Sequence, residues 1–257
     1  MVLCTVLAFA APATSAQPPH SKSQGIRTPT YPTVFSYSGF AGATGLVKNG
    51  TVSQVGQKIQ LVEDGDYSAG SLWYINQVDV AQGFTTNFKF QIVPDPASST
   101  PADGMAFVIQ NAGLGAISPP DGEPGYENIP NSLAVEFDTF LNEHLTDPNN
   151  NHVGIQSCGT APNTLDHNTT CNLGLQPTLP ITLTDHHAHV ATITYDPSVP
   201  VLSISIDNQP VLSSNLDLST LLSLNGNDAW VGFTAGVGAD FEHHYLLNWA
   251  FATQDQN

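Results

Sequence analysis

The feature that most constrains the fold of this chain is a two-residue period of hydrophobicity in short segments. Residues 87–92, Asn-Phe-Lys-Phe-Gln-Ile, alternate strictly between polar and apolar side chains. Successive side chains of a β-strand point to opposite faces, so this segment predicts a strand with one buried and one solvated face. An amphipathic helix would instead repeat its apolar residues every three to four positions.

Ten segments carry strand signals, and clusters of Gly, Pro, Asn and Asp separate them. They are residues 34–40, 71–77, 85–93, 104–109, 132–140, 152–157, 189–195, 201–207, 230–234 and 245–251. Residues 216–224 are the one helical candidate, and the chain does not alternate between strands and helices, which argues against a parallel α/β sheet. The pattern predicts an all-β fold, built as an antiparallel β-sandwich.

The charge balance of the chain argues against anionic binding partners. Five Lys and Arg residues oppose 22 Asp and Glu residues, the formal net charge is -17, and the last basic residue is Lys89. Nucleic acids and anionic membrane surfaces need Lys or Arg to neutralise phosphate, so neither is a predicted partner. No apolar run is long enough to cross a bilayer, so we do not expect membrane insertion. The acidic composition favours a soluble protein that recruits cations.

The N-terminal residues predict export. An apolar run over residues 2–11 is followed by small residues up to Ala16, as in a secretory signal peptide. The usual basic residues before such a run are missing, so a poorly ordered N-terminal tail is the alternative. The predicted boundaries are a signal peptide over 1–16, a polar tether over 17–31, one domain over 32–253 and a tail over 254–257, in a secreted, extracellular protein.

The cysteine count fits this location. Cys4 would leave with the signal peptide, and Cys158 and Cys171 would remain as a pair within a segment rich in loops. A disulfide between them would close a long loop in an oxidising compartment. The alternative is two unpaired thiols in a cytosolic protein.

The most informative residues lie between 131 and 156, where a strand ends in a polar loop and a second strand begins. Glu136 and Asp138 are two residues apart on the first strand, so their carboxylates share a face. Such a pair repels strongly in a half-buried position unless one group is protonated or a cation lies between them. Asn142, Asp147 and His152 add further ligand atoms. Oxygen ligands suit Ca²⁺, and carboxylates with one imidazole suit a transition ion such as Mn²⁺. The alternative is a solvated acidic loop.

Three separated blocks resemble the signature of legume lectins and their L-type lectin relatives. The blocks are Val-Glu-Phe-Asp-Thr-Phe at 135–140 with Asn142, Asp147-Pro148 and His-Val-Gly-Ile at 152–155; Ala-Asp-Gly-Met-Ala-Phe at 102–107; and Trp-Val-Gly-Phe-Thr-Ala at 230–235 with Leu-Asn-Trp-Ala-Phe at 247–251. They occur in the family's order, and the resemblance spans about residues 34–253. It implies the jelly-roll, concanavalin-like lectin fold and a non-catalytic, metal-dependent carbohydrate-binding function.

The resemblance also implies residue roles. The manganese ligands would be Glu136, Asp138, Asp147 and His152, and the calcium ligands Asp138, the Phe140 carbonyl, Asn142 and Asp147. Asp103, the Gly125 backbone N–H, the Phe140 ring, the Asn142 amide, Ala239 and Asp240 would contact the sugar. The peptide bond between Ala102 and Asp103 would be cis, as it is in the family. Glycans or glycoproteins would be the partners, and relatives often form homo-oligomers.

Several alternatives stay open. Phe140 could be core filler, Gly125 a turn glycine and Asp240 an exposed carboxylate. The histidines at 186, 187, 189, 243 and 244 are expected to be surface or edge residues rather than a further metal site. A glycoside hydrolase of the same sandwich fold would need a second positioned carboxylate three residues after Asp138, where Leu141 stands. A structural or adhesive module that keeps the metals without binding sugar is the other rival function. Sugar preference is not predicted.

Overall fold

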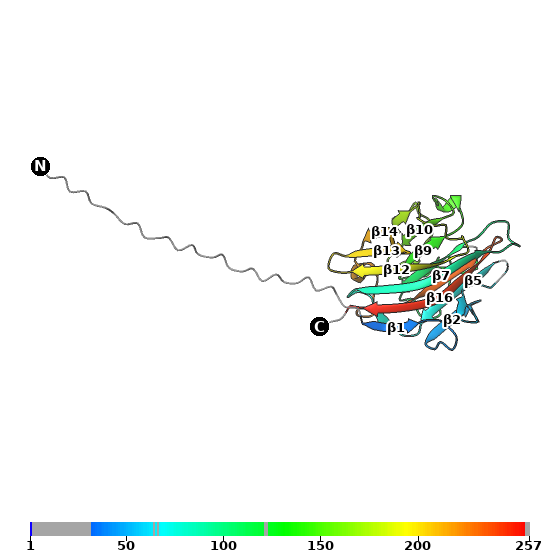
Figure 1. The fold of residues 1–257 in the computed structure, drawn as a ribbon, viewed down its shortest axis with the longest axis horizontal. Helices are drawn as coiled ribbons and strands as arrows, with labels where there is room; N and C mark the ends of the chain where they lie inside the picture. Colours follow the sequence, from blue (N-terminus) through cyan, green and yellow to red (C-terminus); the bar gives the residue numbers. More distant parts are fainter. Residues whose placement is uncertain (2–31, 64, 66, 121–122, 255–257) are drawn as a thin grey trace.

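The structure is a computed structural model that describes residues 1, 32–63, 65, 67–120 and 123–254. The predicted signal peptide and tether, Met1 apart, lie outside the described residues, as do residues 255–257 of the predicted tail. Two antiparallel sheets pack face to face, as the alternating segments predict (Figure 1).

One sheet has, in spatial order, β14 (Gln209–Asn215), β13 (Val201–Ile206), β12 (Ala188–Asp196), β7 (Phe84–Pro94), β16 (Glu242–Thr253), β4 (Lys58–Gln60) and β3 (Ser53–Val55), and β1 (Thr33–Tyr37) pairs with β16. β7 and β16 are its long central pair, and β7 keeps the predicted alternation of buried and more exposed residues. We call this sheet A.

The other sheet, sheet B, has β11 (Asn172–Gln176), β10 (His152–Gln156), β9 (Ser132–Asp138), β8 (Gly104–Gln110), β15 (Asp228–Val237), β5 (Ser68–Tyr74) and β2 (Leu46–Gly50), and β6 (Val78–Asp79) pairs with β15. The only helical turns in the described residues are η1 (Glu143–Leu145) and α1 (Leu218–Leu221). All ten predicted strands and the short helix are therefore confirmed. Six short strands, β2, β3, β4, β6, β11 and β14, were not predicted.

The central strands of sheet B are buried on both faces, whereas its edge strands β2 and β11 are partly exposed. Every residue of β8, β9 and β10 is buried. Their inward side chains, among them Phe107, Val135 and Phe137, form the core between the sheets. The outward residues pack in a second apolar cluster with Trp73, Tyr126 and others under long loops. The loops therefore shield the outer face of sheet B from water, and this is the face that carries the polar site.

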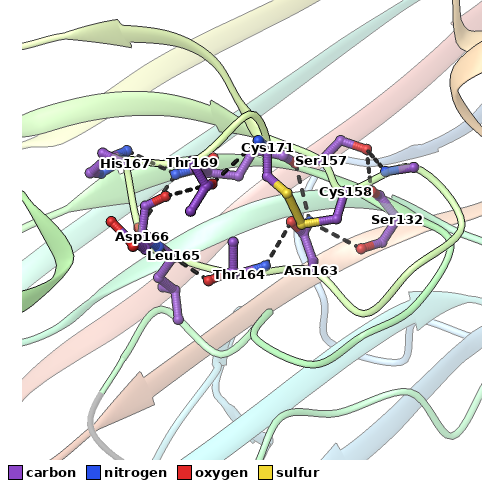
Figure 2. The surroundings of a disulfide bond; sticks show 12 residues. Ser132, Ser157, Cys158, Asn163, Thr164, Leu165, Asp166, His167, Thr169 and Cys171 are labelled. Atoms are coloured by element: carbon purple, nitrogen blue, oxygen red, sulfur yellow. Dashed lines mark hydrogen bonds between the residues drawn. A yellow bond between two sulfur atoms is a disulfide. The ribbon is translucent and has the colours of Figure 1, made fainter.

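The predicted disulfide between Cys158 and Cys171 is present, with a sequence separation of 13 (Figure 2). It closes a loop over the outer face of sheet B. Asn163 fastens this loop to the sheet by donating side-chain hydrogen bonds to Ser132 and to the Gln156 carbonyl, each 3.1 Å long. Among the described residues, no helix is long and apolar enough to cross a membrane.

Candidate functional site

The carboxylates of the predicted hairpin lie on the outer face of sheet B, where β8, β9 and β10 meet. The strand register sets His152 opposite Asp138 and Gly154 opposite Glu136. Directly paired residues share a face, so Glu136, Asp138 and His152 all point outward. A Cβ on Gly154 would lie 2.1 Å from Glu136 Oε1, so only glycine leaves room for this carboxylate.

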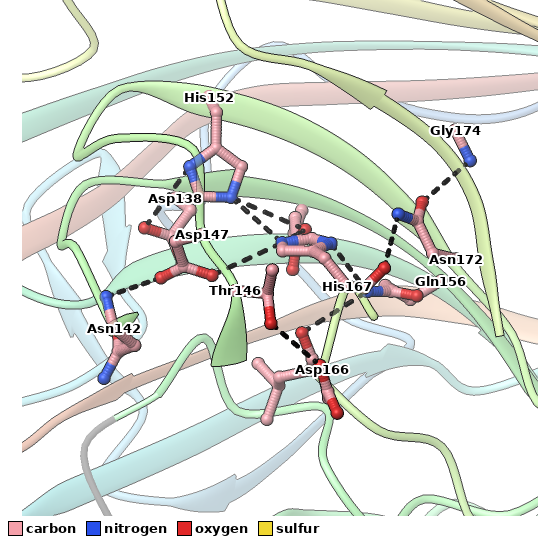
Figure 3. Close-up of polar contacts among 12 residues, drawn as sticks. Asp138, Asn142, Thr146, Asp147, His152, Gln156, Asp166, His167, Asn172 and Gly174 are labelled. Atoms are coloured by element: carbon pink, nitrogen blue, oxygen red, sulfur yellow. Dashed lines mark hydrogen bonds and ion pairs between the residues drawn. The ribbon is translucent and has the colours of Figure 1, made fainter. Parts of the chain in front are cut away.

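The buried Glu136 carboxylate lies among nitrogen and oxygen atoms. Figure 3 shows His152, His167 and Asp147 of this group. Glu136 Oε2 accepts a short hydrogen bond from the Tyr126 hydroxyl. Its Oε1 lies 3.8 Å from His152 Nε2 and 3.1 Å from His167 Nε2. The two Nε2 atoms are 3.2 Å apart. These three residues each offer one ligand atom, and the atoms all lie within 4.8 Å of one another.

His167 was not among the predicted ligands. Asp138, which was, does not join the three-atom group: its Oδ1 accepts a 2.9 Å hydrogen bond from the Phe140 N–H and lies 3.9 Å from Nδ1 of His152, on the other side of that ring. The one sequence signal for His167 was its place between the two cysteines of a predicted disulfide.

Asp147 faces two ways. Its Oδ2 accepts a 2.6 Å hydrogen bond from the Asn142 N–H, and its Oδ1 lies 3.5 Å from His167 Nε2. The turn η1 between Asn142 and Asp147 brings these residues together. Asp147 thus links the imidazole group to the segment 138–142, where the predicted calcium ligands Asp138, Phe140 and Asn142 follow one another. Phe140 and Asn142 are half-buried.

In the absence of a cation, the surroundings of this group disfavour the ionised form of its aspartates. Burial first, and then the charges of Glu136 and Asp147, raise the pKa of Asp138 well above its usual range. Burial also raises the pKa of Asp147 to about 6 and lowers that of His152. Burial opposes the charge on His167, but its hydrogen bond to Glu136 and the nearby carboxylates outweigh this and raise its pKa. A bound divalent cation would lower the pKa values of these carboxyl groups, because it favours their ionised form.

Asp103 lies beside this group, because β8 begins where β9 ends. Gly104 pairs with Asp138, and the Asp103 carbonyl accepts a hydrogen bond of 3.2 Å from the Thr139 N–H. The Asp103 Oδ2 accepts a 2.9 Å hydrogen bond from the Gly238 N–H. The peptide bond from Ala102 to Asp103 is cis, as expected. Asp103 is therefore held between the hairpin and the loop that follows β15.

The remaining predicted sugar contacts come from two loops next to Asp103. Gly125 has φ +81°, and a Cβ there would lie 2.6 Å from the Ala235 carbonyl, so the turn and its close approach to β15 require glycine. Ala239 is exposed. The Asp240 Oδ1 accepts hydrogen bonds from Ser98, Ser99 and the Thr100 N–H, which lower its pKa. Asp240 therefore fastens one loop to another, a role that the sequence did not predict.

The residues present fit a divalent cation at the group of Glu136, His152 and His167. Glu136 Oε1 is buried, and Nε2 of His152 and Nε2 of His167 lie 3.8 and 3.1 Å from it. His152 Nδ1 lies 2.9 Å from the Asn149 carbonyl, which orients the ring with Nε2 toward the group. Imidazole nitrogens with carboxylates suit a transition ion, and the oxygen-rich segment from Asp138 to Asp147 suits Ca²⁺.

A family model described as the legume lectin beta-barrel domain matches residues 35–248, most of the chain. The chain belongs to the legume lectin family. An L-type lectin-domain containing receptor kinase of Arabidopsis thaliana, named V.9, is 30% identical over 75% of this chain and 31% of its own length. The chain spans about a third of the length of such receptor kinases. The seed lectin beta chain of Spatholobus parviflorus is 29% identical over 73% of this chain and 77% of its own length.

Solved legume lectins share the fold of this legume lectin. A peanut lectin, solved with a nine-residue peptide, has a TM-score of 0.69 at 24% identity and covers 88% of this chain and 100% of its own. The Bauhinia forficata lectin, solved in complex with GalNAc, has a TM-score of 0.67 at 24% identity, with coverage of 89% and 100%. The resemblance of the three sequence blocks and the predicted jelly-roll sandwich are thereby confirmed.

Proposed function

We propose that this legume lectin domain binds glycans at Asp103, beside two bound cations, and releases them unchanged. One observation carries the proposal: Asp103, a buried residue, is hydrogen-bonded through its backbone carbonyl to the end of the hairpin that carries Asp138, Asn142 and Asp147. Relatives with this domain are carbohydrate-binding lectins, and one such lectin is solved with a sugar derivative, GalNAc.

A sugar ring presents hydroxyls that both donate and accept hydrogen bonds, on a ring with weakly polar C–H faces. Asp103 is the fixed acceptor in this proposal, and the Asn142 amide and the Gly125 N–H are the donors. The Phe140 ring, half-buried, offers an apolar plate for one face of the sugar. Ala239, exposed in the next loop, adds contacts that depend on the particular glycan.

The cations serve to order this receptor. Asp138, the Phe140 carbonyl, Asn142 and Asp147 would hold Ca²⁺, and Glu136, Asp147, His152 and His167 line the transition-ion position. Bound cations supply charge that fixes these carboxylates, so less conformational entropy is lost when the sugar binds. The residues proposed to hold the cations also fix the positions of the neighbouring groups that contact the sugar.

Non-catalytic binding is favoured over hydrolysis by the surroundings of the carboxylates. Leu141 stands where a sandwich-fold glycosidase would carry its second carboxylate. The histidines at the transition-ion position are buried, His152 fully, so a glycan has no path to an ion held there. We further propose a secreted protein, which the Cys158–Cys171 disulfide supports, since such bonds persist in oxidising compartments.

A glycan array probed with the full chain tests the proposal, with Ca²⁺ and Mn²⁺ added and again in excess chelator. We expect metal-dependent binding to a limited set of glycans, with every recovered glycan intact by mass spectrometry. The Asp103→Asn variant should keep its melting temperature and lose binding at least tenfold, because it replaces a charged acceptor. Metal binding with no glycan bound would favour the adhesive-module alternative, and shortened glycans would favour the hydrolase.

A further inference from the structure

The loop closed by Cys158 and Cys171 brings one side chain, His167, into the centre of the polar group on sheet B. The His167 N–H donates to the Leu145 carbonyl over 2.9 Å, and its own carbonyl accepts from Asn172 Nδ2 over 3.0 Å. Both ends of the loop are tied to each other by the disulfide (Figure 2). His167 is therefore held by its backbone on both sides of the residue, and the loop is joined to β10, the strand of His152.

The His167 ring is also oriented by a specific contact. The side-chain Nε2 of Gln156 on β10 donates to Nδ1 over 2.8 Å and to the Leu165 carbonyl over 3.3 Å. Nε2 of His167 faces Glu136 Oε1 and His152 Nε2, at 3.1 and 3.2 Å. Figure 3 shows Gln156 and His152 on either side of His167. Within the described residues, Gln156 Oε1 is buried without a hydrogen-bond partner. Rotation of this amide would place Oε1 against an Nδ1–H and leave the Nε2 lone pair free. In the orientation observed, Gln156 Nε2 donates to Nδ1 and the proton of a neutral ring lies on Nε2, so coordination through Nε2 requires this rotation.

The spacing of the three ligand atoms matches a shared cation. Zinc holds imidazole nitrogen and carboxylate oxygen at about 2.1 Å, so neighbouring ligand atoms lie about 3.0 Å apart at right angles and about 3.4 Å apart in a tetrahedron. The observed separations among Glu136 Oε1, His152 Nε2 and His167 Nε2 are 3.1, 3.2 and 3.8 Å. Asp147 Oδ1 lies 3.5 Å from His167 Nε2, outside this three-atom group.

We propose that His167 is a direct ligand in a Glu136–His152–His167 site, and that this second imidazole makes the site select Zn²⁺ over Mn²⁺. The inference deepens the proposed function, because it concerns the transition-ion position described there. Imidazole favours zinc, whereas carboxylate and water favour manganese, and zinc stands above manganese in the general order of divalent-ion affinity. Two imidazoles and one carboxylate are a ligand set that zinc takes in proteins, with water in the fourth position.

The test measures Zn²⁺ and Mn²⁺ affinity of the full chain by competition with a chromophoric chelator, in the absence of glycan. His167→Ala should weaken Zn²⁺ binding on the order of 100-fold and Mn²⁺ binding no more than about tenfold, since it removes a nitrogen ligand. His167→Gln covers the case in which the alanine variant fails to fold. The matched control is His189→Ala, a buried histidine of β12 that has two carboxylate partners and lies in the other sheet.

X-ray absorption of the zinc-loaded protein supplies a direct count of ligands. We expect two imidazoles in the unaltered chain and in His189→Ala, and one in His167→Gln. Unchanged zinc affinity in both His167 variants, or a single imidazole in the unaltered chain, would overturn the inference. Glycan binding measured on the same samples separates the two claims: a chain that binds zinc with two imidazoles but no glycan contradicts the proposed function alone.

Discussion

Two groups of histidine and carboxylate side chains in this lectin contain the same residue types, but the pKa values of their carboxylates shift in opposite directions. The inner cluster is Glu136, Asp138, Asp147, His152 and His167 on sheet B. The outer cluster is Asp185, His187, His189 and Asp207, beside β12 of sheet A. In the outer cluster His189 Nδ1 lies 2.6 Å from Asp207 Oδ2 and Nε2 lies 3.0 Å from Asp185 Oδ1, so both ring nitrogens contact carboxylates.

Exposure separates the two clusters. The Asp185 and Asp207 side chains are 32% and 40% exposed. The modest burial of Asp207 opposes its charge, but hydrogen bonds from His189 and the Val190 N–H lower its pKa, and Asp185 is lowered in the same way. In the inner cluster burial dominates and raises the pKa of Asp138 and Asp147. Hydrogen bonds within the outer cluster favour its ionised carboxylates, whereas burial in the inner cluster favours neutral carboxyls unless a cation binds.

Metal removal is the strongest test of whether the inner cluster, rather than the outer one, binds cations. Ions at about a thousand times their dissociation constant stabilise a protein by about 4 kcal/mol, which for a domain of this size is about 10 °C in melting temperature. We expect a loss of that size when chelator is added to the metal-loaded chain, measured by calorimetry. His189→Ala should lower both melting temperatures and leave their difference unchanged. A chelator effect that disappears in His189→Ala would place the ions at the outer cluster.

Gly154→Ala tests whether the inner cluster depends on the space for Glu136. The added Cβ would lie 2.1 Å from Glu136 Oε1, so the carboxylate must move. We expect the metal-free chain to lose about 1–3 kcal/mol in free energy of unfolding by urea titration, with weakened transition-ion binding. The control is Gly174→Ala on the neighbouring β11, whose Cβ would lie in ordinary contact with the ends of the Leu212 and Ile155 side chains, at 3.4 and 3.7 Å. Equal effects of the two substitutions would contradict the role assigned to Gly154.

Acid should affect the two clusters with opposite sign. The raised pKa values of Asp138 and Asp147 favour the metal-free fold at low pH, and this contribution is lost as pH rises through about 6 for Asp147. Bound ions need these groups ionised, so the metal-induced rise in melting temperature should shrink by about half or more between pH 7.5 and 5.5. The lowered pKa values of Asp185 and Asp207 stabilise the fold above about pH 4, and this is lost below it. A metal-induced rise that is constant over this range would contradict the assignment.

The sequence predicted the fold where strands lie in the interior of a sheet. β8, β9 and β7 carry long apolar or alternating runs that no other structure would bury. The strands that escaped prediction are short or lie near sheet edges. β3 is exposed throughout, and β14 contains Pro210. Their strand conformation comes from pairing with a neighbour rather than from local pattern, so no local signal announced them.

The site was predictable where its residues are close in sequence. The hairpin from Glu136 to His152 is local, so strand alternation and a single turn determine its geometry. His167 enters from a loop whose path depends on a disulfide and on Asn163, which are tertiary contacts. The expectation that His189 and His244 are surface or edge residues was wrong about their exposure, since both are buried. Asp207 reaches His189 through the pairing of neighbouring strands, which single-sequence patterns do not reveal. Glu242, the partner of His244, stands two residues earlier on the same strand, so strand alternation could have predicted that contact.

The smallest expected effect is that of Asp207→Asn in the outer cluster. The substitution removes one of the two carboxylates at His189 and keeps the size of the side chain. Because Asp207 is well exposed, we expect a loss of less than about 1 kcal/mol in free energy of unfolding at pH 7. The metal-induced rise in melting temperature should not change.

Asp147→Asn is the counterpart in the inner cluster. It should strongly reduce the metal-induced rise in melting temperature and have little effect on the stability of the metal-free chain, because the neutral amide removes a buried charge. A larger effect of Asp207→Asn than of Asp147→Asn on the metal response would show that exposure does not separate the clusters.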